Sequence, residues 1–182
     1  MALASTPLRY GSVAQIFHWT TAILVVAAFV YGPGGSELRV YSSARDFDRQ
    51  LHETLGISVF ALSLLRLAWR AFDATPAAPA MPQWMKRPAK VSHATLYILL
   101  LAVPLTAISG AWLEGHPLTF LGNVRVGPWL TEAHAVGAWL ASLHTWLGDA
   151  ILWIAGLHTA AALFHHFILK DDLLRSMLPG RR

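Results

Sequence analysis

Four long apolar stretches limit what this chain can fold into. They cover about residues 13–31, 51–72, 91–113 and 135–169, and each can cross the roughly 30 Å hydrocarbon core of a bilayer as a helix. Charged residues make up only 13% of the 182 residues, against about 25% in soluble domains. We therefore predict an all-α fold: a bundle of four transmembrane helices that forms a single integral membrane domain over residues 1–182.

The distribution of lysine and arginine predicts the orientation of this bundle. With four spans, ten of the 14 basic residues fall on the side of the two chain ends, and four fall on the other side. For a protein of the bacterial inner membrane, the positive-inside rule then places both termini in the cytoplasm. The basic residues flank the apolar stretches and form no basic face, so we expect membrane lipid around the protein and no nucleic-acid partner.

Histidine is the residue type best suited to hold a cofactor here. Cysteine is absent, which excludes thiolate metal sites, cysteine-held iron–sulfur clusters and attached c-type haem. The chain has nine histidines, most of them in or beside the apolar stretches. An imidazole ring is costly in such surroundings unless a partner satisfies its polar atoms. A cofactor with a metal ion is one such partner.

Four of the histidines fall at matching depths when the spans alternate in direction. The outer pair is His52 and His144, and the inner pair is His18 and His158. His144 and His158 are 14 residues apart on one helix, which is about 21 Å along its axis and nearly the same face. Each level offers two imidazoles from neighbouring helices, whereas zinc requires three or four ligands. The pattern therefore favours two b-type haems bound between the helices, each held by two histidines.

Arginines near the membrane edges are candidates for binding the haem propionates, because guanidinium pairs well with carboxylates. Placement by the positive-inside rule alone is the alternative for each of them. We expect the inner propionates to use one of Arg9, Arg66 and Arg70, and the outer propionates one of Arg45, Arg49 and Arg125.

Two glycines and one carboxylate are further candidates at the outer level. Gly56 and Gly148 each follow an outer histidine by four residues, where they could let a flat ring approach the backbone or simply pack helices. Asp149 is predicted to contact the outer haem site or to handle protons, with an outer-interface position as the alternative.

Three histidines remain near the inner surface. His93 has no expected partner at its level, so it would border a quinone pocket, contact a propionate or lie at the interface. His165 and His166 are expected to reach the surface or a propionate. We assign no chemistry to His116 and His134, which fall in or beside an outer loop.

Several motifs match one family pattern over most of the chain. They are Arg9-Tyr10 with His18-Trp19, His52 with Gly56 and the ending Leu65–Arg70, His93 with Leu96-Tyr97 and Pro104-Leu105-Thr106, and finally His144, His158 and Ala161–Phe167. In these residues the chain resembles the prokaryotic cytochrome b561 proteins, although Ala107 stands where that family usually has a glycine. The resemblance implies that the four histidines of the inner and outer pairs bind two haems, in agreement with their depths.

An iron ion with two histidine ligands has no open position, which favours electron transfer over oxygen chemistry at the metal. We therefore expect a membrane oxidoreductase or electron carrier that moves electrons across the bilayer. The resemblance implies exchange with ubiquinone or another quinone, and superoxide oxidation coupled to ubiquinone reduction as one activity. A positive outer surface would steer superoxide, but that side holds four basic and seven acidic residues.

Two other functions fit the same pattern. The first is a cytochrome b subunit that anchors a dehydrogenase or hydrogenase and receives electrons from this soluble redox partner. The second is a haem-free helical transporter with polar histidines in its core.

Overall fold

The computed structural model describes residues 2–34, 36–77 and 81–179. Its long helices are α1 (Ser12–Val30), α3 (Asp46–Phe72), α4 (Gln83–Leu113) and α5 (His134–Phe164), and a π-helical turn over His165–Leu169 extends α5. Within the described residues, four helices are long and apolar enough to cross a membrane. The predicted all-α bundle is thus confirmed, with four helices at the places where the spans were expected.

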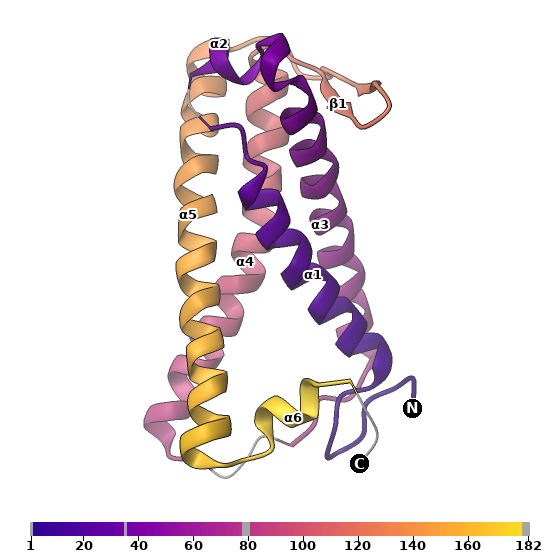
Figure 1. Ribbon diagram of the computed structural model, residues 1–182, viewed down its shortest axis with the longest axis vertical. Coiled ribbons are helices and arrows are strands. Elements are labelled where there is room, and N and C mark those ends of the chain that lie inside the picture. The colour runs from indigo at the N-terminus through magenta and orange to yellow at the C-terminus, as the bar shows by residue number, and fades with distance from the viewer. Residues whose placement is uncertain (1, 35, 78–80, 180–182) are drawn as a thin grey trace.

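The helices form two closely packed pairs. α1 packs against α3, α4 packs against α5, and α3 also contacts α4. Figure 1 shows the N-terminal segment and the short helix α6 (Leu173–Met177) at one end of the bundle, which we call the terminal end. The opposite end, which we call the hairpin end, carries α2 (Glu37–Val40), a short 3-10 turn (Ser43–Arg45) and the antiparallel strands β1 (Leu118–Phe120) and β2 (Val124–Val126).

Two helices begin earlier than the apolar stretches suggested. α4 includes Pro88, which lies before the expected third stretch at residues 91–113. The missing N–H of Pro88 leaves only the carbonyl of Trp84 without its helical donor, and that carbonyl lies in the exposed first turns. α3 begins at Asp46, where the Arg49 guanidinium bonds Asp46 one turn before it and Glu53 one turn after it.

The apolar core is small and lies midway along the bundle. Val59 of α3, Leu99 and Leu100 of α4 and Ile151 of α5 are buried, and α1 contributes partly buried side chains such as Leu24. Many other large apolar side chains are exposed, as expected for helix faces that contact lipid rather than water. Ile151 stands seven residues from both His144 and His158, so this core separates the two histidine levels.

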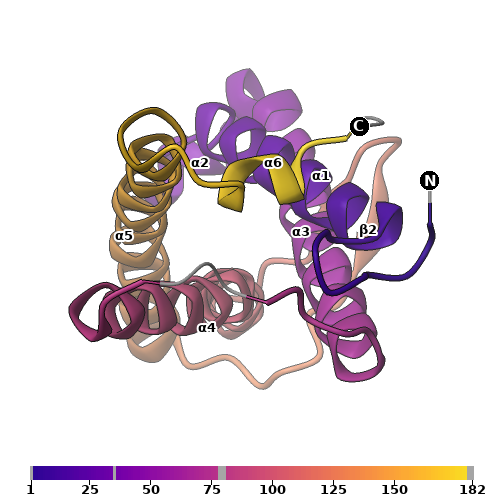
Figure 2. The ribbon, with the colours of Figure 1, turned by 90° about the horizontal axis from the view of Figure 1, so that it is seen from below.

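The segment that follows α5 is hydrogen-bonded to the N-terminal part of the chain at the terminal end. The indole N–H of Trp19 donates to the carbonyl of Met177 over 2.9 Å, and the Gln15 amide donates to the carbonyl of Ser176 over 3.2 Å. The Arg9 guanidinium donates to the carbonyl of Leu178. Figure 2 shows α6 lying across this end of the bundle. We call residues 173–178 the strap, because they link the end of the chain back to α1.

The closest approach of α4 and α5 depends on Gly110. A Cβ atom at this position would lie 3.2 Å from the backbone nitrogen of Ala141 and 3.3 Å from the carbonyl oxygen of Gly137. Neither backbone atom can move without separating the helices. The glycine therefore provides the close contact that small residues give to membrane helices.

We predict that Gly110→Val destabilises the bundle by about 1–3 kcal/mol, since the added methyl groups meet backbone. The measurement is the thermal unfolding midpoint of the purified protein in detergent. Gly156→Val is the matched control, because a Cβ atom there meets no atom within 4 Å and Gly156 is also helical. Equal unfolding midpoints for the two variants would contradict this role of Gly110.

Candidate cofactor sites in the helical bundle

The structure brings His52 of α3 and His144 of α5 together near the hairpin end. Their ring centroids are 5.9 Å apart, and the ring planes are inclined at 82°. His52 Nδ1 lies 2.7 Å from the carbonyl oxygen of Ala28, and His144 Nδ1 lies 2.9 Å from that of Val103. A carbonyl oxygen only accepts, so in each ring the Nδ1–H donates and Nε2 keeps its lone pair for a metal ion.

The two accepting carbonyls differ in their places in the helices. Ala28 lies in the last turn of α1, where carbonyl groups lack a helical donor. Val103 directly precedes Pro104 within α4, and the missing N–H of Pro104 frees the carbonyl of Leu100, four residues earlier, rather than that of Val103. The hydroxyl of Thr106 donates to the same Val103 carbonyl over 2.8 Å. The Val103 carbonyl thus accepts from Thr106 in its own helix and from His144 on α5, and the second bond orients the His144 ring.

The second pair lies toward the terminal end. The ring centroids of His18 on α1 and His158 on α5 are 6.5 Å apart, with the planes at 71°. The Arg66 guanidinium reaches His18 Nδ1 over 3.2 Å and also lies 5.4 Å from the centroid of the Tyr97 ring. The His93 ring of α4 also lies near His158, with ring centroids 5.3 Å apart. The expectation that His93 has no partner at its level was therefore wrong.

The spacing of both pairs fits two imidazoles on one metal ion. Two rings bound through nitrogens about 2 Å from a shared ion have centroids about 6 to 6.5 Å apart. In the part of the chain that the structure describes, no group of three or more His, Asp or Glu side chains is placed to hold a metal ion. A b-type haem, which brings four nitrogen ligands of its own, fits such two-histidine sites.

Gly56 and Gly148 leave room beside the first pair. They lie one helical turn after His52 and His144, and a Cβ atom at either glycine would meet no atom within 4 Å. They are therefore not contacts between packed helices, which was one of the two interpretations of their spacing. The open space on this face of α3 and α5 fits a flat ring close to the backbone.

Of the arginines considered for propionates, the structure brings only Arg66 beside a paired histidine. Arg70 lies 5.8 Å from the centroid of the Tyr97 ring, one turn further toward the terminal end. Arg9 donates to the strap. At the hairpin end, Arg45 pairs with Asp48 over 2.9 Å.

Three other predicted residues lie apart from the histidine pairs or are already bonded. Arg49 is held by two carboxylates and is 9% exposed. Arg125 is exposed on β2, and Asp149 is exposed on α5 without a bond to either histidine of the first pair. The structure therefore leaves Asp149 at the surface of the bundle.

A polar cluster at the hairpin end was missed by the sequence analysis. The Tyr41 ring stacks on His116 with centroids 3.6 Å apart, and His116 Nε2 lies 2.6 Å from the Glu37 carboxylate. Glu53 accepts the backbone N–H of Thr119 on β1, which docks the hairpin on α3. Burial raises the pKa of the Tyr41 hydroxyl. His116 and Glu37 are 79 residues apart, so no local pattern could have linked them.

At the terminal end, the remaining two histidines take separate roles. His165 Nδ1 lies 2.6 Å from the carboxylate of Asp171, and His166 lines a pocket beside α6. Tyr10 lies near Arg66 and Arg70, and its burial raises the pKa of its hydroxyl.

Comparison with known proteins identifies the family that shares this arrangement. Residues 9–180 match the family described as prokaryotic cytochrome b561. Cytochrome b561 homolog 2 of Escherichia coli is 31% identical over 98% of this chain and 95% of the relative, and homolog 1 is 33% identical over 96% and 99%. A probable superoxide oxidase CybB of Yersinia pestis is 26% identical over 96% and 98%. The chain therefore belongs to the prokaryotic cytochrome b561 family, whose members are helical membrane proteins that carry b-type haem and transfer electrons.

Proposed function

We propose that this protein transfers electrons across the membrane through two b-type haems and exchanges them with the quinone pool. His52 and His144 hold one haem near the hairpin end, and His18 and His158 hold the other toward the terminal end. When bound, each haem supplies a one-electron ferric/ferrous couple. The positive-inside distribution of lysine and arginine supports a cytoplasmic terminal end.

The observation that carries this proposal is that two pairs of imidazole rings lie at the spacing of metal ligands, with one ring of each pair on the same helix, α5. The ring centroids are 5.9 Å apart in one pair and 6.5 Å apart in the other. The two histidines that α5 contributes, His144 and His158, are about 21 Å apart along the helix axis. Two histidines would hold each haem iron, which would leave no open position on the metal for a substrate. This arrangement supports electron transfer at the haem edge.

The chain's own residues orient and tune the two sites. The carbonyls of Ala28 and Val103 fix the rings of His52 and His144 and raise their basicity as ligands. Arg66 brings a positive charge to His18 at the other level. These unlike surroundings give the two haems different potentials, because the potential follows charge and hydrogen bonds around the ligands.

Superoxide is the first electron donor to test, since one relative is named as a probable superoxide oxidase. The hairpin end offers it little steering, because Arg45 and Arg49 are paired with carboxylates. Protein reconstituted in vesicles with ubiquinone would be exposed to ubiquinol or to superoxide while haem absorbance is recorded. Reduction by ubiquinol supports quinone exchange, and reduction by superoxide adds that donor. No reduction by either would overturn quinone exchange and favour a soluble redox partner.

We predict that the four histidine variants fall into two spectral classes. His18→Ala and His158→Ala should lose one haem component, while His52→Ala and His144→Ala lose the other, because each replacement removes one of two axial ligands. The measurements are haem content per intact protein and reduced-minus-oxidised spectra. His134→Ala, at an exposed position that starts α5, is the control and should keep both components. A component lost in common by His18→Ala and His144→Ala would refute the pairing.

We also predict that Arg66→Gln lowers the midpoint potential of the terminal-end haem by tens of millivolts. Removing a cation beside a ligand favours the ferric state, which carries one more positive charge. Redox titration of the two haem components checks the shift. Lys86→Gln removes a charge from the exposed start of α4 and should leave both potentials unchanged. A shift confined to the hairpin-end haem would show that Arg66 does not act on the His18 site.

A further inference from the structure

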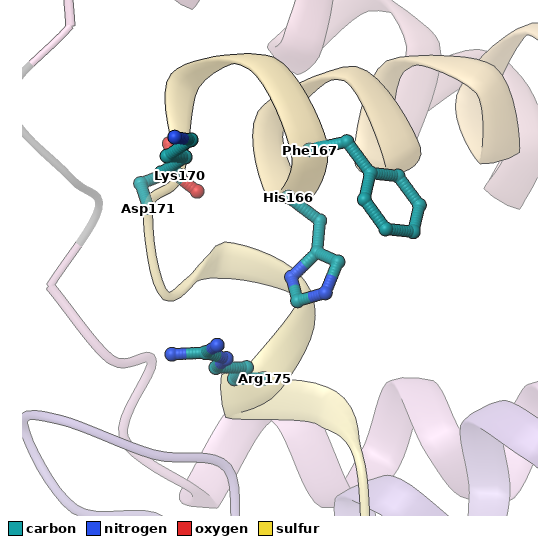
Figure 3. Close-up of a pocket in the computed structure, with 5 residues that line it drawn as sticks. All are labelled: His166, Phe167, Lys170, Asp171 and Arg175. Carbon is teal, nitrogen blue, oxygen red and sulfur yellow. The ribbon is translucent and has the colours of Figure 1, made fainter.

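A pocket of about 330 Å³ lies at the terminal end, where α5 gives way to α6. His166 and Phe167 line it from the π-helical turn, Lys170 and Asp171 from the turn that follows, and Arg175 from α6 (Figure 3). Lys170 has the left-handed backbone conformation that reverses the chain here. None of these residues takes part in the histidine pairs.

The polar groups around this pocket suit an anion. Lys170 and Arg175 bring two cationic side chains, both exposed. His166 Nδ1 is buried and has no hydrogen-bond partner among the described residues, which is costly for a polar atom. In Figure 3 the His166 ring points from the π-helical turn toward α6, which carries Arg175. A bound oxyanion would satisfy all three groups.

The acidic side chains near the pocket do not neutralise its positive charge. Both carboxylate oxygens of Asp171 are engaged, one with His165 Nδ1 at 2.6 Å and the other with the backbone N–H of Leu173 at 3.1 Å. Arg175 has a long 3.5 Å contact with Asp172, and both side chains are more than half exposed. Such an exposed pair contributes little and leaves the guanidinium able to bind a phosphate.

Apolar side chains continue from the pocket along the membrane face of α5. Phe167 lines the pocket and is 65% exposed, Ile168 is 64% exposed, and Phe164 is 47% exposed one turn earlier. This segment closes the fourth candidate span, so it lies at the level of lipid headgroups. A ligand with a phosphate at the pocket and acyl chains along Phe167 and Phe164 matches both surfaces.

We propose that this pocket binds the phosphate of an anionic phospholipid such as phosphatidylglycerol. A positive charge in the headgroup, such as the choline ammonium of phosphatidylcholine, would be repelled by Lys170 and Arg175, so the site selects for lipids with net negative charge. The bound lipid would link the end of α5 to α6 and thereby support the strap on α1.

The test measures binding of defined lipids to the delipidated holoprotein in detergent by native mass spectrometry and by the thermal unfolding midpoint. Phosphatidylglycerol should bind and raise the midpoint, while phosphatidylcholine and inorganic phosphate should do neither. Lys170→Asn with Arg175→Gln should weaken phosphatidylglycerol binding about tenfold or more, through loss of two charge-assisted contacts. Asparagine is chosen because it tolerates the left-handed conformation of residue 170.

The matched control is Lys86→Gln with Arg87→Gln, which removes the same charge from the same end of the bundle, outside the pocket. It should bind phosphatidylglycerol like the unmodified protein. Equal loss in both double variants would mean diffuse attraction and overturn the site. Binding of inorganic phosphate with equal effect would overturn the lipid as ligand. If the variant with both Lys170→Asn and Arg175→Gln does not fold, Lys170→Asn alone is compared with Lys86→Gln. Unchanged phosphatidylglycerol binding by Lys170→Asn would then overturn the proposal.

Discussion

Hydrocarbon offers no hydrogen-bond partner, so each polar group inside this bundle needs one from the protein. His52 can face the interior because α1 ends near it and leaves the Ala28 carbonyl free. His144 can do so because its Nδ1–H donates to the Val103 carbonyl of α4. Each of these bonds lies within one closely packed helix pair, α1 with α3 or α4 with α5. The facing rings, in contrast, belong to different pairs, so the proposed haems would join the two halves of the bundle.

The elements that could be predicted from the sequence are those governed by local period and composition. Apolar length located the four helices, and the 14-residue spacing of His144 and His158 placed both on one face of α5. The agreement in depth between His18 and His158 followed because antiparallel helices of similar length share their levels. The positions of the helices and the levels of the histidines thus follow from regular helix geometry, which residue spacing in the sequence determines.

The parts that escaped prediction depend on contacts between distant segments. The stacking of Tyr41 on His116 joins two connecting segments far apart in the sequence. The approach of His93 to His158 requires knowledge of how α4 and α5 rotate about their axes. Helix rotation also decides that Arg66, rather than Arg9, reaches His18. The inclusion of Pro88 in α4 was missed for another reason, since the cost of a proline depends on whether the freed carbonyl is exposed.

The small apolar core midway along the bundle has a consequence for energetics. Val59, Leu99, Leu100 and Ile151 lie between the two histidine levels, and partly buried apolar side chains such as Leu24 and Leu96 pack on them. None of these four buried side chains is titratable, so none of them could carry a proton alongside an electron. Under the proposed function, electron movement between the two levels would therefore be electrogenic. Its driving force would change with the membrane potential, by a share of the roughly 2.3 kcal/mol per charge per 100 mV that applies to the full membrane thickness.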